Sequence, residues 1–356
     1  MSPTQPPTNV LVTGATGFIG SAIVRALLER GDNVVALVEP GVDDGNLAGV
    51  DVRRVPGDLR DVDQVKRAVS GCTSVFHVAA MYRFFAPDQR AFYDVNVGGT
   101  RAVLAAAREA GVQRVVYTST VGTLGLDHAG AAGATETDYP DVGHLFGAYK
   151  RSKYVAEHEA LRAAAQGLPV TLVLPTMPIG PRDRAPTPSG KLVLDYLNGR
   201  MPAYVDTVLN VVHVDDVARG HLLAHDRGEV GRSYIIGGEN LAMREVLAEL
   251  AAVTGLPAPS VQVPRSAVLA AAWLSELVEA RLLHRPPHVP LEAARMSTTR
   301  MAFDDSRARG ELGHTSRPPR QALADAARWY LRNGYVSPRR RARITLAVDR
   351  DAQAPL

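Results

Sequence analysis

A glycine-rich turn between an apolar strand and a helix constrains the fold of this chain more than any other feature. In "NVLVTGATGFIGSAIVRALLERG", Gly14, Gly17 and Gly20 follow a predicted strand, Asn9–Thr13, and open a predicted helix, Phe18–Arg30. Such a turn lets the backbone approach a pyrophosphate, and the N–H groups and positive dipole end of the helix point toward that charge. Because strand and helix supply the context that glycines alone lack, the sequence predicts a dinucleotide-binding turn rather than a purely structural one.

Short β-rich runs alternate with helical patterns through residues 9–176, which is typical of crossovers and a parallel sheet. The strands are nearly all apolar, as in a sheet covered on both faces. We therefore expect an α/β fold with a Rossmann-type doubly wound sheet and a smaller C-terminal substrate-binding lobe. The expected division is a flexible N-terminus at 1–8, a nucleotide-binding domain at 9–176 to which 211–240 return as strand plus helix, a substrate lobe at 177–210 and 241–336, and a loose basic tail at 337–356.

Composition excludes several classes of protein. Forty Lys and Arg against 37 Asp and Glu are near balance, without the clustered basic face and aromatic platforms of a nucleic-acid binder. The lone cysteine, Cys72, excludes an intramolecular disulfide framework and a cysteine-based zinc site, and reads as a small core residue. There is neither a signal-peptide pattern nor an apolar run that could span a bilayer, so we expect a cytoplasmic protein. The RRRAR run of the tail reads as solvated, with contact to anionic lipid or nucleic acid as the alternative.

A catalytic constellation follows in the same half of the chain. "GAYKRSKYVAEHEAL" places Tyr149 and Lys153 four residues apart, on one helix face. A phenol with a pKa of about 10 is a poor proton donor or acceptor at neutral pH, and a neighbouring ammonium lowers that pKa. A hydroxyl at a strand end should complete the site, and "VVYTSTVGTLG" offers Thr118, Ser119 and Thr120.

An acid ends the second predicted strand, in "VVALVEPG". Glu39 lies nineteen residues after Gly20. In a dinucleotide-binding fold, an acid at about this spacing accepts hydrogen bonds from the adenosine ribose and repels the extra phosphate of NADP. Glu39 therefore predicts NAD as cofactor, with NADP as the alternative if the side chain points to solvent.

These motifs together resemble the extended short-chain dehydrogenase/reductase family over residues 9 to about 336. "GDLRD" resembles the family's adenine-side motif, "HVAA" the strand end that lines the cofactor, and "NVGGT", with Asn96, the following helix. The resemblance implies a cofactor site made by Gly14, Thr16, Gly17, Phe18, Ile19, Gly20, Glu39, Asp58, Leu59, Ala79, Ala80, Tyr149, Lys153 and Pro175.

The resemblance also implies the roles of the catalytic residues. Counted back from Gly125, Thr120 falls at the catalytic Ser/Thr position, with Ser119 beside it. Tyr149 would exchange a proton with the substrate oxygen, Thr120 would orient that oxygen, and Lys153 would tune Tyr149 and anchor the cofactor.

A tighter resemblance is to the dihydroflavonol-reductase-like branch, and within it to hopanoid-associated sugar epimerases. "LNGRMPAYVDTVLNVVHVDDVARGHLLA" followed by "YIIGGEN" carries it, with "MYRFFAPD" and "GPRDRAPTPSGK". Sugar epimerases typically have an Asn within N-x-x-G-P, where this chain has Met177, and a thioether cannot do the work of that amide. The resemblance therefore favours carbonyl/alcohol redox on a sugar-like or hopanoid-linked polyol.

Two alternatives remain for the reaction: epimerisation by transient oxidation with tightly held NAD, and a non-catalytic dinucleotide sensor. Tyr82, Arg83 and Met177 are the candidate substrate residues. The family resemblance further implies a homodimer formed through the helices that carry Asn96 and Tyr149.

Two further patterns have plainer explanations. His213, Asp215 and Asp216 lie at a strand-to-helix junction, where an Asp that caps the helix fits better than a metal site. The apolar helix predicted over residues 266–285, with Trp273, is expected to pack against the second lobe, and lying on a membrane surface is the alternative.

Overall fold

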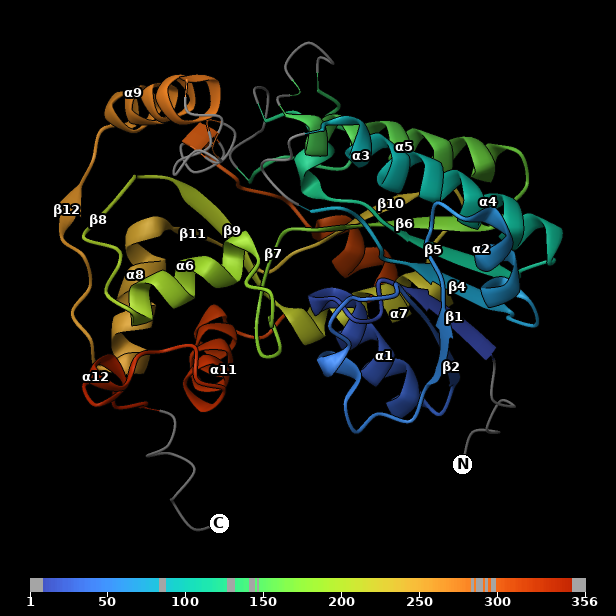
Figure 1. Ribbon diagram of the computed structural model, residues 1–356, viewed down its shortest axis with the longest axis horizontal. Coiled ribbons are helices and arrows are strands. Elements are labelled where there is room, and N and C mark those ends of the chain that lie inside the picture. Colours follow the sequence, from blue (N-terminus) through green and yellow to red (C-terminus); the bar gives the residue numbers. More distant parts are fainter. Residues whose placement is uncertain are drawn as a thin grey trace.

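A computed structural model describes residues 9–82, 88–126, 132–140, 145, 147–282, 285, 291, 294–295 and 299–347. Its centre is a seven-stranded parallel sheet in the order β3-β2-β1-β4-β5-β6-β10 (Figure 1). The strands are β1 Asn9–Thr13, β2 Asn33–Val38, β3 Arg53–Pro56, β4 Ser74–His77, β5 Arg114–Thr118, β6 Val170–Pro175 and β10 Ser233–Ile236. The expected doubly wound α/β fold is confirmed.

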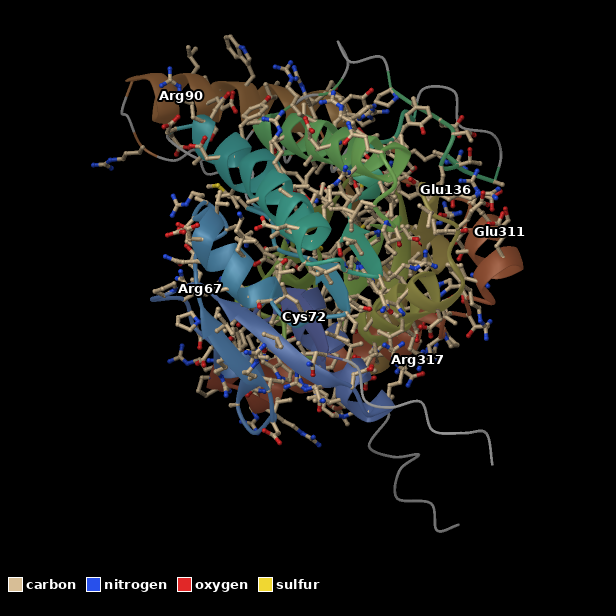
Figure 2. All side chains as sticks on the ribbon, turned by 90° about the vertical axis from the view of Figure 1, so that its right-hand side faces the viewer. Arg67, Cys72, Arg90, Glu136, Glu311 and Arg317 are labelled. Carbon is tan, nitrogen blue, oxygen red and sulfur yellow. The ribbon has the colours of Figure 1, made fainter. Side chains whose placement is uncertain are left out.

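Helices cover both faces of this sheet, as its apolar strands require. One face carries α2 Val62–Val69, α4 Gly99–Glu109 and α5 Ala148–Ala165, and the other carries α1 Phe18–Arg30 and α7 Val214–Arg227 (Figure 1). Successive residues of a strand point to opposite faces. Leu11 accordingly packs into the α4 and α5 side, while Val10 and Val12 pack into the α1 and α7 side. Cys72 is buried at the end of α2, beside the strands (Figure 2).

The second lobe has its own small sheet and its own core. Strands β7 Met177–Ile179, β9 Val208–His213 and β11 Glu239–Ala242 form the sheet, and β8 Ala203–Tyr204 pairs with β12 Val261–Gln262. Helices α6 Pro188–Leu197, α8 Met243–Thr254 and α11 Pro319–Arg332 enclose the apolar core against it (Figure 1). The other helices with both bounds among the described residues are α3 Arg90–Tyr93, α9 Arg265–Ser275 and α12 Pro338–Arg341. π-Helical turns lie at Asp94–Gly98, Glu276–Leu282 and Ala308–Leu312, and 3₁₀ turns at Gly45–Leu47 and Val121–Thr123.

The strand expected to return to the main sheet does not do so. β9 pairs in parallel with β7 and antiparallel with β11, and it is β10, after α7, that joins the main sheet beside β6. The reason lies in the two faces of β9. Leu209 and Val211 pack into the core of the second lobe, whereas Val212 packs into the core of the main sheet, so this strand joins the two lobes.

The expectation of a loose tail from residue 337 is wrong for its described part. Pro338–Arg341 form α12, and the N–H groups of Thr345 and Ala347 donate to the carbonyls of Thr254 and Val253. Ile344 and Leu346 add apolar contacts to the core of the second lobe. Backbone pairing and apolar burial therefore hold the chain to residue 347, while 1–8 and 348–356 lie outside the described residues.

Candidate active site

The glycine turn forms a backbone cradle at the start of α1. Gly14 has a φ of 67°, and a Cβ there would lie 2.8 Å from the backbone of Ala79. A Cβ on Gly20 would overlap the carbonyl oxygen of Gly14. Gly17 is the N-cap of α1; among the described residues no side chain caps it, and the first turn has no acid. The first N–H groups of the helix therefore remain available to an anion, and the cradle fits the pyrophosphate of a dinucleotide.

The expected cofactor residues lie along the carboxyl ends of the parallel strands, which share one edge of the sheet. Glu39 follows β2 and is exposed, Asp58 follows β3, Ala79 and Ala80 follow β4, and Pro175 ends β6. Thr16, Phe18 and Ile19 are half-buried in and just after the turn.

The side chains of Asp58 and Leu59 already have partners within the protein. The Asp58 carboxylate accepts hydrogen bonds from the guanidinium of Arg60 at 2.5 to 3.0 Å, which lowers the pKa of that carboxyl. The side chain of Leu59 is buried in the core, where a Cβ on Gly99 would lie 2.9 Å from it. A cofactor bound at the end of β3 would therefore contact the Asp58–Arg60 ion pair and the backbone of Leu59.

A buried histidine joins the end of β1 to the end of β4. Thr13 Oγ1 accepts hydrogen bonds from two backbone N–H groups after β4, so its own proton goes to His77 Nδ1, at 2.8 Å. His77 Nε2–H then donates to Thr100 Oγ1 at 3.0 Å, and Thr100 donates to the carbonyl of Asn96. Burial, followed by the charge of Lys153, lowers the pKa of His77 to about 3. This neutral histidine holds the strand ends beside the glycine turn.

Lys153 reaches from α5 to the end of β5. Its Nζ donates to the hydroxyl of Tyr117 at 2.9 Å and to the carbonyl of Thr118 at 2.7 Å. Burial lowers the pKa of Lys153 to about 7. It also raises the pKa of Tyr117 well above the ordinary value, with the negative charge of Glu157 as the next cause. Sequence reasoning missed Tyr117, although it stands one residue before Thr118 in the same motif.

Tyr149 lies one turn before Lys153, with an aromatic ring over it. The rings of Tyr149 and Tyr82 have centroids 4.8 Å apart at 44°. Tyr149 is nearly buried, whereas Tyr82 is exposed, so Tyr82 forms an outer wall of this position. Met177, the first residue of β7, is half-buried. Arg83, the third expected substrate residue, lies outside the described residues.

A buried carboxylate, which sequence reasoning also missed, binds the hydroxyls after β5. Glu157 accepts hydrogen bonds from Ser119 Oγ at 2.5 Å and Thr123 Oγ1 at 2.8 Å, and burial raises its pKa. Thr120 Oγ1 instead accepts from the N–H of Gly122 at 3.1 Å, a bond that leaves its own proton unused. The signal in the sequence is the continued spacing of four residues, from Tyr149 through Lys153 to Glu157.

A π-helical turn before α4 brings Asn96 to the same region. Its Oδ1 accepts from the N–H of Met81 at 2.7 Å, and its Nδ2 donates to Ser152 Oγ at 2.9 Å. π-Helical turns are frequent at functional sites, because the extra residue redirects side chains. Here the turn ties the segment after β4, and with it Tyr82, to the helix that carries Tyr149.

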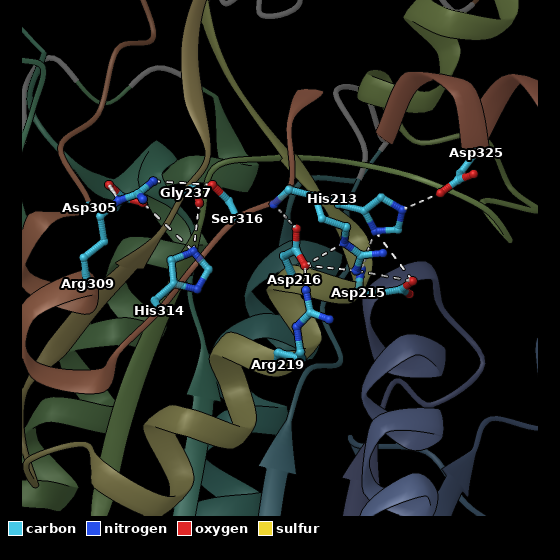
Figure 3. A network of polar contacts seen from close by, with 11 residues as sticks. His213, Asp215, Asp216, Arg219, Gly237, Asp305, Arg309, His314, Ser316 and Asp325 are labelled. Carbon is cyan, nitrogen blue, oxygen red and sulfur yellow. Dashed lines mark hydrogen bonds and ion pairs between the residues drawn. The ribbon is translucent and has the colours of Figure 1, made fainter. Parts of the chain in front are cut away.

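A polar network joins the two lobes at the start of α7 (Figure 3). The expected capping of α7 occurs through a different residue: His213 Nδ1, not an Asp, accepts from the N–H of Asp215 at 3.0 Å, and its Nε2 bonds Asp325 at 3.2 Å. Asp216 accepts from the N–H and Nε of Arg317 and pairs with Arg219. The two guanidiniums neutralise and hydrogen-bond the buried Asp216 carboxylate, so we assign a structural role to this network. Within the described part of the chain, no group of three or more His, Cys, Asp or Glu side chains could hold a metal ion.

The doubly wound sheet, the glycine cradle and the polar side chains at the strand ends together define a dinucleotide-binding α/β protein. Residues 10–237 match the model of the NAD dependent epimerase/dehydratase family. The chain belongs to this family, as the resemblance to extended short-chain dehydrogenase/reductases led us to expect.

Three relatives illustrate the range of this family. A putative dihydroflavonol 4-reductase of Synechocystis is 46% identical, over 91% of this chain and 95% of its own length. Sterol demethylase protein B of Methylococcus capsulatus is 37% identical, over 92% and 99%. The crystal structure of a nucleoside-diphosphate-sugar epimerase of Pseudomonas aeruginosa superposes with a TM-score of 0.77 at 26% identity, covering 93% of this chain and 99% of that one. This chain is thus similar both to proteins named as reductases and to sugar epimerases.

Proposed function

We propose that the protein transfers hydride between a nicotinamide cofactor and a carbonyl/alcohol substrate, with Thr120, Tyr149 and Lys153 as the catalytic residues. The observation that carries this proposal is the position of Lys153. It is a buried amine, and its Nζ bonds Tyr117 and Thr118 at the carboxyl end of β5, directly before Ser119 and Thr120. Tyr149 shares its helix face one turn away.

The bound cofactor would supply or accept the hydride. Tyr149 would give a proton to the substrate oxygen in reduction and take it back in oxidation. Thr120 would donate its hydroxyl proton to the same oxygen, because its Oγ1 is held in place by the N–H of Gly122. Lys153, as an ammonium, would lower the pKa of the Tyr149 phenol. Ser119 is engaged by Glu157, which supports Thr120 as the residue that contacts substrate.

NAD is the cofactor that we propose, with NADP as the alternative. The cradle of Gly14, Gly17 and Gly20 would hold the pyrophosphate, and Glu39, exposed at the end of β2, would accept the ribose hydroxyls. Solved relatives support this choice, since the 4,6-dehydratase DesIV of Streptomyces venezuelae, 28% identical, was crystallised with NAD.

A net reductase is favoured over an epimerase. Met177 cannot make the hydrogen bonds of the amide that sugar epimerases carry at this place, and the aromatic Tyr82 lies over Tyr149. The 46% identity to a protein named as a reductase points the same way. The substrate that we propose, which the family resemblance implies, is a sugar-like or hopanoid-linked polyol or its carbonyl form. The likeness to a sugar epimerase keeps epimerisation by transient oxidation as the second candidate.

One experiment separates these possibilities. The purified protein is mixed with each candidate carbonyl compound and NADH, and absorbance of NADH and isomer composition are followed together. A reductase consumes NADH in proportion to product, whereas an epimerase equilibrates isomers with no net change. The variant Tyr149→Phe should lose turnover by about 1,000-fold or more while NADH binding changes little. Unchanged turnover in this variant would refute the mechanism, and NADH binding without turnover on any substrate would favour a dinucleotide sensor.

We also expect a homodimer formed through α4 and α5. Its test is the mass of the purified protein by light scattering, since a monomer at all concentrations would contradict the expectation.

A further inference from the structure

Helix α9 exposes an apolar stripe that the rest of the second lobe leaves uncovered. Of its eleven residues, only Ala272 is buried. Trp273 is 59% exposed, Leu274 is 55% exposed, and Val278, in the π-helical continuation, is 38% exposed. Ala267, Ala270 and Ala271 are exposed as well. With steps of three or four residues, Ala267, Ala270, Leu274 and Val278 lie along one side of the helix.

This stripe is unusual for the molecule and for the lobe to which it belongs. Among the described elements, α9 contacts chiefly its own continuation, Glu276–Leu282, whereas α6, α8 and α11 pack together around the core. Figure 1 shows α9 at the outer edge of the lobe, apart from those three helices. The helix was expected to pack against the second lobe; Ala272 is buried, but Trp273 and Leu274 stay exposed, so the packing leaves much of its apolar surface uncovered.

Among the described residues around the stripe, the fully exposed charges have one sign, while Glu276 and Glu279 are half-buried. Among the described residues from 256 to 300, the exposed charged side chains are all arginines, namely Arg265, Arg285, Arg295 and Arg300. The two glutamates of the continuation are turned into local contacts. Glu276 accepts from the N–H of Leu291, and Glu279 accepts from Ser275 Oγ at 2.5 Å. The apolar stripe and its exposed tryptophan therefore have an exposed arginine beyond each end, Arg265 at the start of α9 and Arg285 after the continuation.

We propose that α9 docks this protein on an anionic bilayer surface. The stripe would enter the boundary between headgroups and acyl chains, where a tryptophan is favoured because its ring is apolar and its N–H can still meet water. The flanking arginines would meet the anionic headgroups. No described helix is long and apolar enough to cross a membrane, so the contact is with the surface.

The charge complementarity selects this occupant over a second copy of the chain. A second α9 would bring its own Arg265 and Arg285 against these, and like charges across an interface oppose association. An anionic surface instead gains from each arginine.

The test is flotation of the full-length protein with vesicles of phosphatidylcholine, or of phosphatidylcholine mixed with phosphatidylglycerol. We expect flotation with the anionic vesicles, a decrease in high salt, and a blue shift of tryptophan fluorescence. Trp273→Ser/Leu274→Ser should reduce the partition coefficient by about tenfold or more, and Arg265→Glu/Arg285→Glu by a similar factor. Thermal unfolding and cofactor binding should be unchanged in both variants.

Matched controls separate this helix from other surfaces. Val62→Ser/Val230→Ser removes two similarly exposed apolar side chains elsewhere, and Arg339→Glu/Arg341→Glu reverses two exposed charges of α12; both should float like the wild type. The proposal is overturned if the wild-type protein binds no vesicles, or if Trp273→Ser/Leu274→Ser floats like the wild type. It is also overturned if Arg339→Glu/Arg341→Glu stops binding vesicles while the α9 variants still bind. It is also overturned if the α9 variant turns a dimer into a monomer without any effect on vesicles.

Discussion

Lys153 Nζ and the hydroxyl of Tyr117 lie 2.9 Å apart, and this hydrogen bond links helix α5 to the end of strand β5 beneath the candidate catalytic residues. Both groups are buried, and burial favours the uncharged form of each. It lowers the pKa of Lys153 to about 7 and raises the pKa of Tyr117 well above 10. The protonation state of Lys153 therefore depends on its two hydrogen-bond acceptors, the Tyr117 hydroxyl and the Thr118 carbonyl.

Tyr117→Phe removes one of the two acceptors of the Lys153 ammonium. The charged form loses a partner, so the pKa of Lys153 should fall below about 7. If the ammonium is the active form, the alkaline limb of the kcat/KM profile moves to lower pH, and kcat/KM above that limb falls by about tenfold for each unit of pKa. The pH profile of turnover measures this shift. Tyr234→Phe, at a buried tyrosine of β10, is the matched control, and a Tyr117→Phe profile that coincides with it contradicts the assignment.

Glu157→Gln keeps the shape of the side chain and removes its charge. The carboxylate raises the pKa of Lys153 and holds the hydroxyls of Ser119 and Thr123. Its loss should lower the pKa of Lys153 and free Ser119, so we expect kcat to fall by about tenfold to 100-fold with little change in the KM for cofactor. Steady-state kinetics across pH test this. Glu159→Gln, whose side chain pairs with Arg101 at the surface, should behave like the wild type.

Glu39→Arg reverses the charge at the end of β2, where the adenosine ribose is expected. Loss of the acceptor for the ribose hydroxyls weakens NADH binding, and the new cation attracts the extra phosphate of NADPH. The ratio of kcat/KM for NADH to that for NADPH should fall by about tenfold or more. Asp63→Arg, on the exposed first turn of α2, is the control. A wild-type enzyme that already prefers NADPH strongly would show that Glu39 does not select the cofactor.

Two buried histidines predict how stability depends on pH. Burial lowers the pKa of His77 to about 3 and that of His221 to about 4, so the native protein keeps both neutral. The unfolded chain takes up these protons as pH falls below about 6.5. The free energy of unfolding should therefore decrease from pH 6.5 toward pH 4, by about 1.4 kcal/mol per pH unit for each histidine. Denaturant unfolding at several pH values measures the slope of unfolding free energy against pH. His221→Asn should reduce that slope by the contribution of one proton, about 1.4 kcal/mol per pH unit. An unchanged slope in this variant would contradict the assignment.

The sequence by itself determined the parts of this protein that depend on neighbours along the chain. The glycine turn, the spacing of Tyr149 and Lys153, and the alternation of apolar strands with helices are local patterns, and the family and the doubly wound fold follow from them. The acid at the end of β2 is visible for the same reason, because strand, turn and helix lengths place it there.

Tertiary structure alone decided which distant groups meet. Glu157 bonds Ser119 from 38 residues away, and Lys153 bonds Tyr117 from 36 residues away. The spacing of residues in the sequence does not show that Lys153 bonds the Thr118 carbonyl and the Tyr117 hydroxyl. Nor does it show the burial that shifts the pKa of Lys153. Spacing also does not show that β9 packs into two cores, that the segment Pro338–Ala347 packs on the second lobe, or that the stripe of α9 stays exposed. Burial and long-range contact depend on how the elements pack, and an apolar residue in the sequence carries no mark of whether the fold covers it.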